Sequence, residues 1–166
     1  MMLTARSLDE LSFRDLMEIY AESNLENAQE LWSQLSEGEG ILRVEQDFYR
    51  YLREVFFPVP GAVYCIWEEA GRYISALRLE PYRDGLLVEA LETMPQFRRM
   101  GYGARLLQAA QQLAGEKKLY SHVGKRNTAS LRTHLRCGFQ RVSEQAVYVD
   151  GSVNSYCCTL VYGGNL

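Results

Sequence analysis

The stretch "MPQFRRMGYGARLL", Met94–Leu107, places two arginines and two closely spaced glycines between a strand-like and a helix-like segment. The first four backbone amides of a helix have no partner within the helix, and the helix dipole makes that end attractive to anions. Gly101 and Gly103 would let an anion approach without a Cβ in the way, and Arg98 and Arg99 could add charge-assisted hydrogen bonds. The stretch therefore predicts a phosphate-binding loop; the alternative is a flexible turn with exposed arginines.

Two common nucleotide-binding motifs do not match this loop. Leu106 stands where a dinucleotide-binding fingerprint needs its third small residue, and no GK[ST] sequence is present for a P-loop. A different anion-bearing ligand must therefore be considered.

Helix-like and strand-like patterns alternate on both sides of the loop. Apolar residues recur at helical spacing before the proline-containing segment 57–61, and β-branched and aromatic residues dominate the segments that follow it. The predicted helices are 7–23, 41–57, a segment that begins in the glycine loop and ends at Gly115, and 127–137. The predicted strands are 62–69, 72–82, 85–94, 119–124 and two within 139–162, joined by a turn at Asp150–Gly151. This order predicts an α/β (α+β) fold with a mixed, mostly antiparallel sheet flanked by helices.

Two apolar stripes give the expected buried faces of helices. The second predicted helix carries Ile41, Val44, Phe48, Tyr51, Leu52 and Val55 at i, i+3, i+4, i+7 spacing, and is expected to pack on the sheet. The helix after the glycine loop carries Leu106, Leu107, Ala110, Leu113 and Ala114.

Composition excludes several classes of function. The 166 residues have a net charge of −3, with 47% hydrophobic and 23% charged residues, as expected for one ordinary globular domain. Basic residues concentrate only at Arg98–Arg99 and Lys125–Arg126, so a nucleic-acid partner is not expected. No apolar run approaches a membrane span and the N-terminus lacks a signal-like core, which predicts a cytoplasmic protein. Two histidines and four cysteines without paired CxxC spacing predict no metal site.

Two motifs resemble one known family. Pro95, Arg98, Gly101 and Gly103 form P-x-x-R-x-x-G-x-G directly after a predicted strand, which resembles the acetyl-CoA motif of the GNAT superfamily of N-acetyltransferases. About thirty residues later, "NTASLRTHLRCGF" is similar to the family's N-x-x-[AS]-x-x-L-Y-x-x-x-G-F pattern, with Asn127, Ser130, Gly138 and Phe139 in register. Two motifs in the correct order and at the correct distance are more specific than either one alone.

The resemblance implies a single GNAT-like domain that uses acetyl-CoA as cosubstrate, without a metal. Residues 1–60 would form acceptor-side helices and residues 61–166 the acetyl-CoA-binding core. Backbone groups of Leu91, Glu92 and Thr93 would bind the thioester arm, and a splayed strand would leave the Leu91 or Glu92 amide to polarise the acetyl carbonyl. The remaining contacts to coenzyme A would come from the backbone amides of Arg98, Arg99, Met100, Gly101, Tyr102, Gly103 and Ala104, and from Asn127 and Ser130. A primary amine would attack directly.

The general acid and the general base are open. His134 stands where the family commonly has the tyrosine that protonates the departing thiolate, and it is either that acid or only a polar residue on the helix. Glu89 and Glu92 are candidate bases, with Glu92 preferred; in a regular strand they face opposite sides, unless a bulge intervenes. For either carboxylate the alternative is a solvated or ion-paired side chain.

Two other functions are weighed against acetyl transfer. A catalytically degenerate domain that senses acyl-CoA would explain His134, whereas the intact Pro95–Gly103 loop argues against degeneracy. A structural domain without a coenzyme A site would require both motifs to be accidental. The acceptor amine is not specified, and the C-terminal hairpin offers an edge that could pair two copies as a homodimer.

Overall fold

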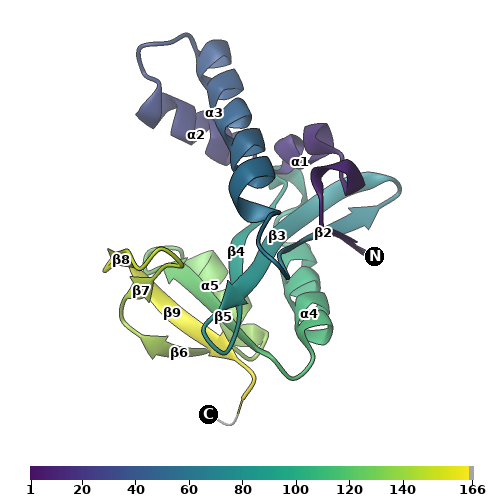
Figure 1. Cartoon of the computed structure of the whole chain (residues 1–166), viewed down its shortest axis with the longest axis vertical. Coiled ribbons are helices and arrows are strands. Elements are labelled where there is room, and N and C mark those ends of the chain that lie inside the picture. Colours follow the sequence, from purple (N-terminus) through teal and green to yellow (C-terminus); the bar gives the residue numbers. More distant parts are fainter. Residues whose placement is uncertain (165–166) are drawn as a thin grey trace.

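The computed structural model describes residues 1–164 and is built around one mixed sheet (Figure 1). Its strand order is β1-β2-β3-β4-β5-β9-β6, and β7 and β8 form a separate hairpin. The strands are β1 (Met2–Ala5), β2 (Val63–Glu69), β3 (Arg72–Tyr82), β4 (Gly85–Thr93), β5 (Lys118–Gly124), β6 (Gln140–Ser143), β7 (Ala146–Val147), β8 (Val153–Asn154) and β9 (Cys157–Tyr162). Within the seven-stranded sheet only β4 and β5 are parallel, so the predicted mixed, mostly antiparallel sheet is confirmed.

Helices cover both faces of the sheet. They are α1 (Phe13–Ile19), α2 (Ala21–Leu31), α3 (Glu37–Tyr51), α4 (Tyr102–Ala114) and α5 (Thr128–Arg136), with short helical turns at Leu8–Glu10, Leu52–Phe56 and Pro95–Phe97. One apolar core lies between the sheet and α4, and includes Leu77, Leu106 and Leu160. A second core lies on the opposite face, where Leu16 and Phe56 pack against Tyr64. No helix within residues 1–164 has both the length and the apolar composition needed to cross a membrane.

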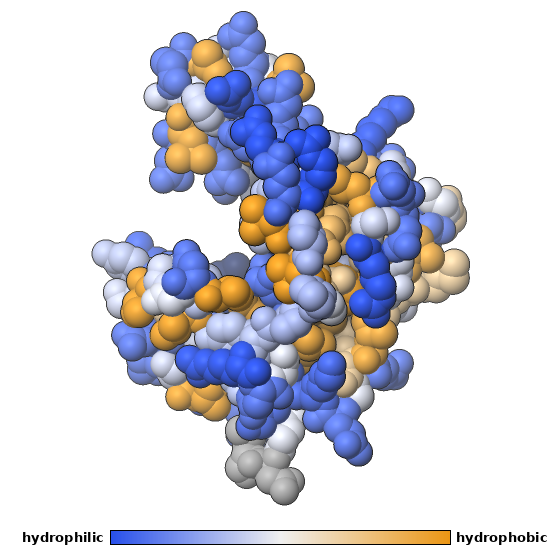
Figure 2. Space-filling model, viewed as in Figure 1, coloured by the Kyte–Doolittle hydropathy of each residue, from blue (hydrophilic) through white to orange (hydrophobic). Residues whose placement is uncertain are grey.

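Helices α2 and α3 form a hairpin that projects beyond the sheet (Figure 1). The two helices pack closely on each other at Gly40, where an added Cβ would lie only 3.2 Å from the Cβ of Ala28. Figure 2 shows a hollow between this helical hairpin and the C-terminal part of the molecule that carries β7 and β8. The expected packing of the second predicted helix on the sheet is therefore correct only for its C-terminal half, where Leu52 and Phe56 are buried and Phe48 and Tyr51 pack against the second core.

The structure corrects several predicted boundaries in the N-terminal region. The first predicted helix is two helices, α1 and α2, and the short edge strand β1 was not predicted. Residues 36–40, expected as a loop, begin α3, because Ser36 and Glu39 form a reciprocal capping box. Val55 is 56% exposed rather than buried, since the five residues that follow α3 form a π-helical turn that changes the period of the apolar stripe.

Two further corrections concern the second half of the chain. Leu113 is 42% exposed, so it does not belong to the buried face of α4, whose last two members are Ala110 and Ala114. The two strands expected within 139–162 are four: β6 pairs with β9, and the turn at Asp150–Gly151 closes only the small β7–β8 hairpin.

Candidate active site

The parallel strands β4 and β5 separate in the middle of the sheet. They pair only from Gly85 with Lys118 to Val88 with Ser121, whereas β4 continues to pair with β3 as far as Thr93 and β5 continues with β9 as far as Gly124. From residue 89 onward the two strands therefore diverge. The backbone of residues 89–93 forms one edge of the resulting gap.

A β-bulge interrupts β4 at this edge. Ala90 has a φ of +50°, and the register with β3 shifts between the pairs Ala76–Glu92 and Arg78–Glu89. The extra residue reverses the alternation, so Glu89 and Glu92 both face the N-terminal helices, while Leu91 packs against the core beneath α4. The expectation that the two carboxylates face opposite sides holds only for a regular strand.

The glycine loop presents a row of backbone amides beside this edge. Arg99 and Gly101 adopt left-handed conformations, with φ of 62° and 86°, and Gly101 is the N-cap of α4. Within the described part of the chain, no hydrogen-bond acceptor is found for the amides of residues 99–104; the first helical bond is Arg105 N–H to the carbonyl of Gly101, at 3.0 Å. This arrangement can bind an anion.

Gly103 brings the two sequence motifs together. A Cβ at Gly103 would lie 3.6 Å from Oγ1 of Thr93 at the end of β4 and 4.0 Å from Cγ2 of Thr133 on α5. The strand end, the glycine loop and the second motif therefore meet at the N-terminus of α4.

The two arginines of the loop differ in their surroundings. Nε of Arg98 donates to the carbonyl of Thr93 at 3.1 Å, and its NH1 group pairs with Glu22 of α2 at 3.0 Å. Its backbone amide donates weakly to Pro95 at 3.3 Å. Arg98 thus connects the loop to the helical hairpin instead of extending into the anion site, whereas the exposed Arg99 has no ion pair among residues 1–164.

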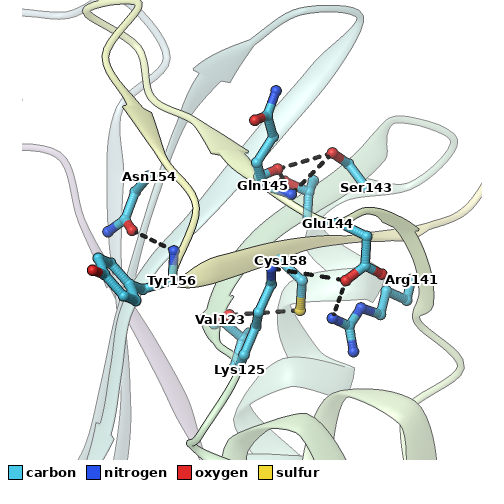
Figure 3. Close-up of polar contacts among 10 residues, drawn as sticks. Val123, Lys125, Arg141, Ser143, Glu144, Gln145, Asn154, Tyr156 and Cys158 are labelled. Carbon is cyan, nitrogen blue, oxygen red and sulfur yellow. Dashed lines mark hydrogen bonds and ion pairs between the residues drawn. The ribbon is translucent and has the colours of Figure 1, made fainter.

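The second motif starts α5 and is connected to the C-terminal strands. Asn127 is the N-cap of α5, as predicted, and its Oδ1 accepts the amide of Ser130 at 3.1 Å. The backbone amide of Lys125 donates to the carbonyl of Tyr156 at 2.9 Å. The Nζ atom of Lys125 lies 3.8 Å from Oε2 of Glu144 (Figure 3). Because Glu144 holds Lys125, the second basic pair of the sequence contributes only Arg126 as a cation without an ion pair in the described residues.

His134 is buried, with 2% of its surface exposed. Its Nδ1 lies 2.8 Å from the carbonyl of Ser130, which can only accept, and its Nε2 lies 2.8 Å from the hydroxyl of Ser121. Burial lowers the pKa of His134, so the ring is neutral and both nitrogens are satisfied inside the protein. The geometry favours a structural polar residue over an acid that faces a ligand.

The two carboxylates differ in their partners. Glu89 contacts Arg78 at 3.2 Å, and burial together with a hydrogen bond shared with Glu80 raises the pKa of Glu89 to about 8. Burial also raises the pKa of Glu92, against the lowering effect of the nearby Ser23 hydroxyl. One oxygen of Glu92, Oε2, is buried and has no hydrogen-bond partner in the described residues.

Sequence reasoning missed a polar network on the helix side of β4. The hydroxyl of Tyr20 donates to the carbonyl of Ala90 at 2.8 Å, and Tyr64 donates to Tyr20 at 2.8 Å. The guanidinium of Arg78 lies 5.0 Å from the ring centre of Tyr51. In the sequence these residues look like ordinary helix-face or strand residues, so no local pattern marks them as part of a functional site.

Comparison with known proteins identifies the family. Residues 13–139 match the model of the acetyltransferase (GNAT) family. No curated protein sequence is detectably similar. Among solved structures, the fold is similar to the PaiA N-acetyltransferase from Thermoplasma acidophilum in complex with coenzyme A, with 12% identity, 99% of both chains covered and a TM-score of 0.61.

Two further structures have the same fold. An N-acetyltransferase from Staphylococcus aureus Mu50 is 14% identical over 98% of both chains, with a TM-score of 0.59. A putative streptothricin acetyltransferase from Bacillus anthracis str. Ames, in complex with acetyl coenzyme A, is 18% identical over 66% of both chains, with a TM-score of 0.54. With the family model covering most of the chain, this protein belongs to the GNAT acetyltransferase family and is an acyl-CoA N-acyltransferase.

Proposed function

We propose that the protein transfers the acetyl group of acetyl-CoA to a primary amine of a small molecule, peptide or protein, by direct attack of the amine nitrogen. One observation carries the proposal: the gap between β4 and β5 opens beside the unpaired amides of residues 99–104. This arrangement suits a pyrophosphate at the start of α4 with an extended arm along β4. Bound acetyl-CoA supplies the acetyl group in activated form, as a thioester.

The residues present fit coenzyme A. The six backbone amides of residues 99–104 have no protein acceptor in the described chain, and Gly103 leaves space between Thr93 and Thr133 where a side chain would stand. Asn127 and Ser130 would contact the pantetheine or phosphate side from the start of α5. Arg99 would add a charge-assisted hydrogen bond to phosphate.

The bulged segment of β4 would act on the acetyl group. Its backbone runs along the gap, where an amide of Leu91 or Glu92 would donate to the thioester carbonyl oxygen and stabilise the negative charge that develops there during attack. The carbonyl of Glu92 accepts a hydrogen bond from Ser75 at 2.7 Å, which limits movement of this segment. Backbone groups of Thr93 would bind the arm further along.

Glu92 would be the general base. The acceptor ammonium must lose a proton before its nitrogen can attack, and a carboxylate with a raised pKa takes up a proton more readily near neutral pH. Because the pKa of Glu89 is raised as well, the choice rests on geometry: Oε2 of Glu92 is buried without a partner in the described residues, whereas the carboxylate of Glu89 is paired with Arg78. In this proposal residues 1–60 form the acceptor side and residues 61–166 the acetyl-CoA-binding core.

The test is release of coenzyme A thiol from acetyl-CoA across a panel of primary amines, with thermal unfolding measured in parallel. Acetyl-CoA at about 100 times its Kd should stabilise the fold by about 2.7 kcal/mol. Thiol release that depends on an amine supports the proposal. Stabilisation without release from any amine contradicts it and favours the acyl-CoA sensor instead.

A further inference from the structure

Tyr20 connects the N-terminal helices to the bulge of β4. It lies at the junction of α1 and α2, is 6% exposed, and its hydroxyl donates to the carbonyl of Ala90 at 2.8 Å. The hydroxyl of Tyr64 donates to that of Tyr20 at 2.8 Å. Because a carbonyl can only accept, the hydrogen bonds run in one direction, from Tyr64 through Tyr20 to Ala90.

The bulge needs an external constraint. Ala90 has a φ of +50°, which an L-residue with a Cβ adopts only at a free-energy cost, and such conformations persist where the surroundings hold them. Tyr20 is fixed in turn, since its own carbonyl accepts the amide of Asn24 at 2.8 Å and the hydroxyl of Ser23 at 3.2 Å. The helix junction is therefore a fixed support for the bulge.

The hydrogen bond to Ala90 also fixes the next amide. The carbonyl of Ala90 and the N–H of Leu91 belong to one planar trans peptide, in which the two groups point in opposite directions. A carbonyl that accepts a hydrogen bond polarises its peptide, and chains of hydrogen bonds strengthen one another. Burial raises the pKa of both tyrosines, so each remains a donor at any practical assay pH.

We infer that Tyr20 is a positioning residue that orients and polarises the Ala90–Leu91 peptide, so that the amide of Leu91, rather than that of Glu92, donates to the acetyl carbonyl oxygen. The inference rests on the proposed function, in which one of these two amides has that role. Tyr20 itself touches neither the acetyl group nor the amine. Its contribution reaches the reaction only through the backbone of β4.

The test compares Tyr20→Phe with Tyr73→Phe. Tyr73 is a matched control, because its hydroxyl also bonds one backbone group of the N-terminal region, the amide of Ser12 at 3.1 Å, without touching β4. Calorimetry measures the Kd of acetyl-CoA and of S-ethyl-CoA, in which a methylene replaces the carbonyl. The ratio of the two Kd values reports the hydrogen bond to the carbonyl and cancels the contribution of general folding defects.

We expect the wild type to prefer acetyl-CoA and Tyr20→Phe to reduce that preference by about fivefold, as for the loss of one hydrogen bond. Tyr73→Phe should leave the preference unchanged. With an accepted amine, Tyr20→Phe should lower kcat by about tenfold at an unchanged KM for the amine. If Tyr20→Phe does not fold, Tyr64→Phe, which removes only the outer donor, should reduce the preference by a smaller factor.

An unchanged Kd ratio in a folded Tyr20→Phe protein, or in Tyr64→Phe where Tyr20→Phe does not fold, would overturn the inference. So would a wild type that does not distinguish the two ligands. If the wild type acetylates no amine, and Tyr20→Phe prefers acetyl-CoA less than the wild type does, the inference holds and the proposed function fails. If it acetylates an amine and Tyr20→Phe changes neither the ratio nor kcat, the proposed function holds and the inference fails.

Discussion

His134 lies where α5 packs on β5, and its two ring nitrogens are bonded to Ser130 and Ser121. Replacement by phenylalanine would leave the buried hydroxyl of Ser121 without this partner. We expect His134→Phe to lower the free energy of unfolding by about 1–3 kcal/mol while kcat stays within about threefold of the wild type. Steady-state thiol release and denaturant unfolding measure both effects. A loss of kcat of a hundredfold or more, restored in His134→Tyr, would instead establish the acid role.

Glu92 and Glu89 can be separated by their isosteric amides. If Glu92 is the base, Glu92→Gln should lower kcat/KM by about 10²- to 10⁴-fold. Glu92→Gln should also remove the rise of kcat/KM with pH that accompanies ionisation of the Glu92 carboxyl. Because the pKa of Glu92 is raised, this rise lies above the pH range in which a glutamate usually ionises. Glu89→Gln, the matched control, can still accept from Arg78 and should cost much less. An equal or larger loss in Glu89→Gln would assign the base to Glu89.

Glu89 also makes stability depend on pH. Its pKa is about 8 in the folded protein and 4.5 in an unperturbed glutamate, so the folded state holds an extra proton between these values. The corresponding stabilisation is complete below about pH 4.5 and is lost as the pH rises through 8. We expect Tm to decrease from pH 5 to 9 and Glu89→Gln to flatten this slope. Thermal unfolding across that range checks the prediction, and equal slopes in both proteins would contradict it.

At the scale of an element, the start of α4 combines two glycines with different roles. Gly101 has a φ of +86° and open space where a Cβ would stand, whereas Gly103 lies within the helix and would make only ordinary contacts with Thr93 and Thr133. The backbone conformation therefore requires a glycine only at Gly101. At Gly103 the proposed binding of coenzyme A would use the space that a side chain would otherwise occupy.

Alanine substitutions separate these requirements. Gly101→Ala should destabilise the fold by about 1–2 kcal/mol, because of its left-handed conformation. Gly103→Ala should keep or slightly raise the stability of the free protein, since alanine favours the helix, yet weaken coenzyme A binding by about tenfold or more. Denaturant unfolding and calorimetry with coenzyme A give the two readouts. Full affinity in Gly103→Ala would mean that the ligand does not approach α4 at this residue.

At the scale of the whole molecule, the chain combines a mixed sheet with a projecting helical hairpin that is markedly acidic. Residues 21–51, which contain α2 and α3, include seven acidic and two basic residues. The base of the hairpin lies beside the glycine loop and the bulged end of β4, where Glu22 pairs with Arg98 and Ser23 lies near Glu92. In the proposed function the hairpin belongs to the acceptor side and the sheet to the cofactor side.

Loosening the hairpin should consequently affect one substrate and not the other. A Cβ at Gly40 would already be 3.2 Å from that of Ala28, so Gly40→Val should push α2 and α3 apart. We expect the KM for the amine to rise about tenfold or more while the Kd for acetyl-CoA stays unchanged. Kinetics with varied amine and calorimetry with acetyl-CoA measure these constants. A weakened Kd with an unchanged KM would show that the hairpin serves the cofactor instead.

The sheet class, α4 and α5 could be predicted from the sequence, because helix caps, turns and glycine conformations depend on nearby residues. Asn127 as a cap, Gly115 as a helix end and the Asp150–Gly151 turn are examples. Two features were not predicted, because they depend on packing against distant parts of the chain: the division of the first helix into α1 and α2, and the edge strand β1.

For the site, the local sequence predicts which residue types are present but not the direction in which each side chain points. Three features of the site are set by long-range packing: the bulge at Ala90 turns Glu89 and Glu92 to one side, Arg98 pairs with Glu22, and His134 is enclosed between α5 and β5. Each of these depends on a partner distant in the sequence, such as Tyr20, which lies 70 positions from Ala90. The physical reason is that motif spacing records local backbone geometry, whereas hydrogen-bond direction and burial are set by the elements that pack against it.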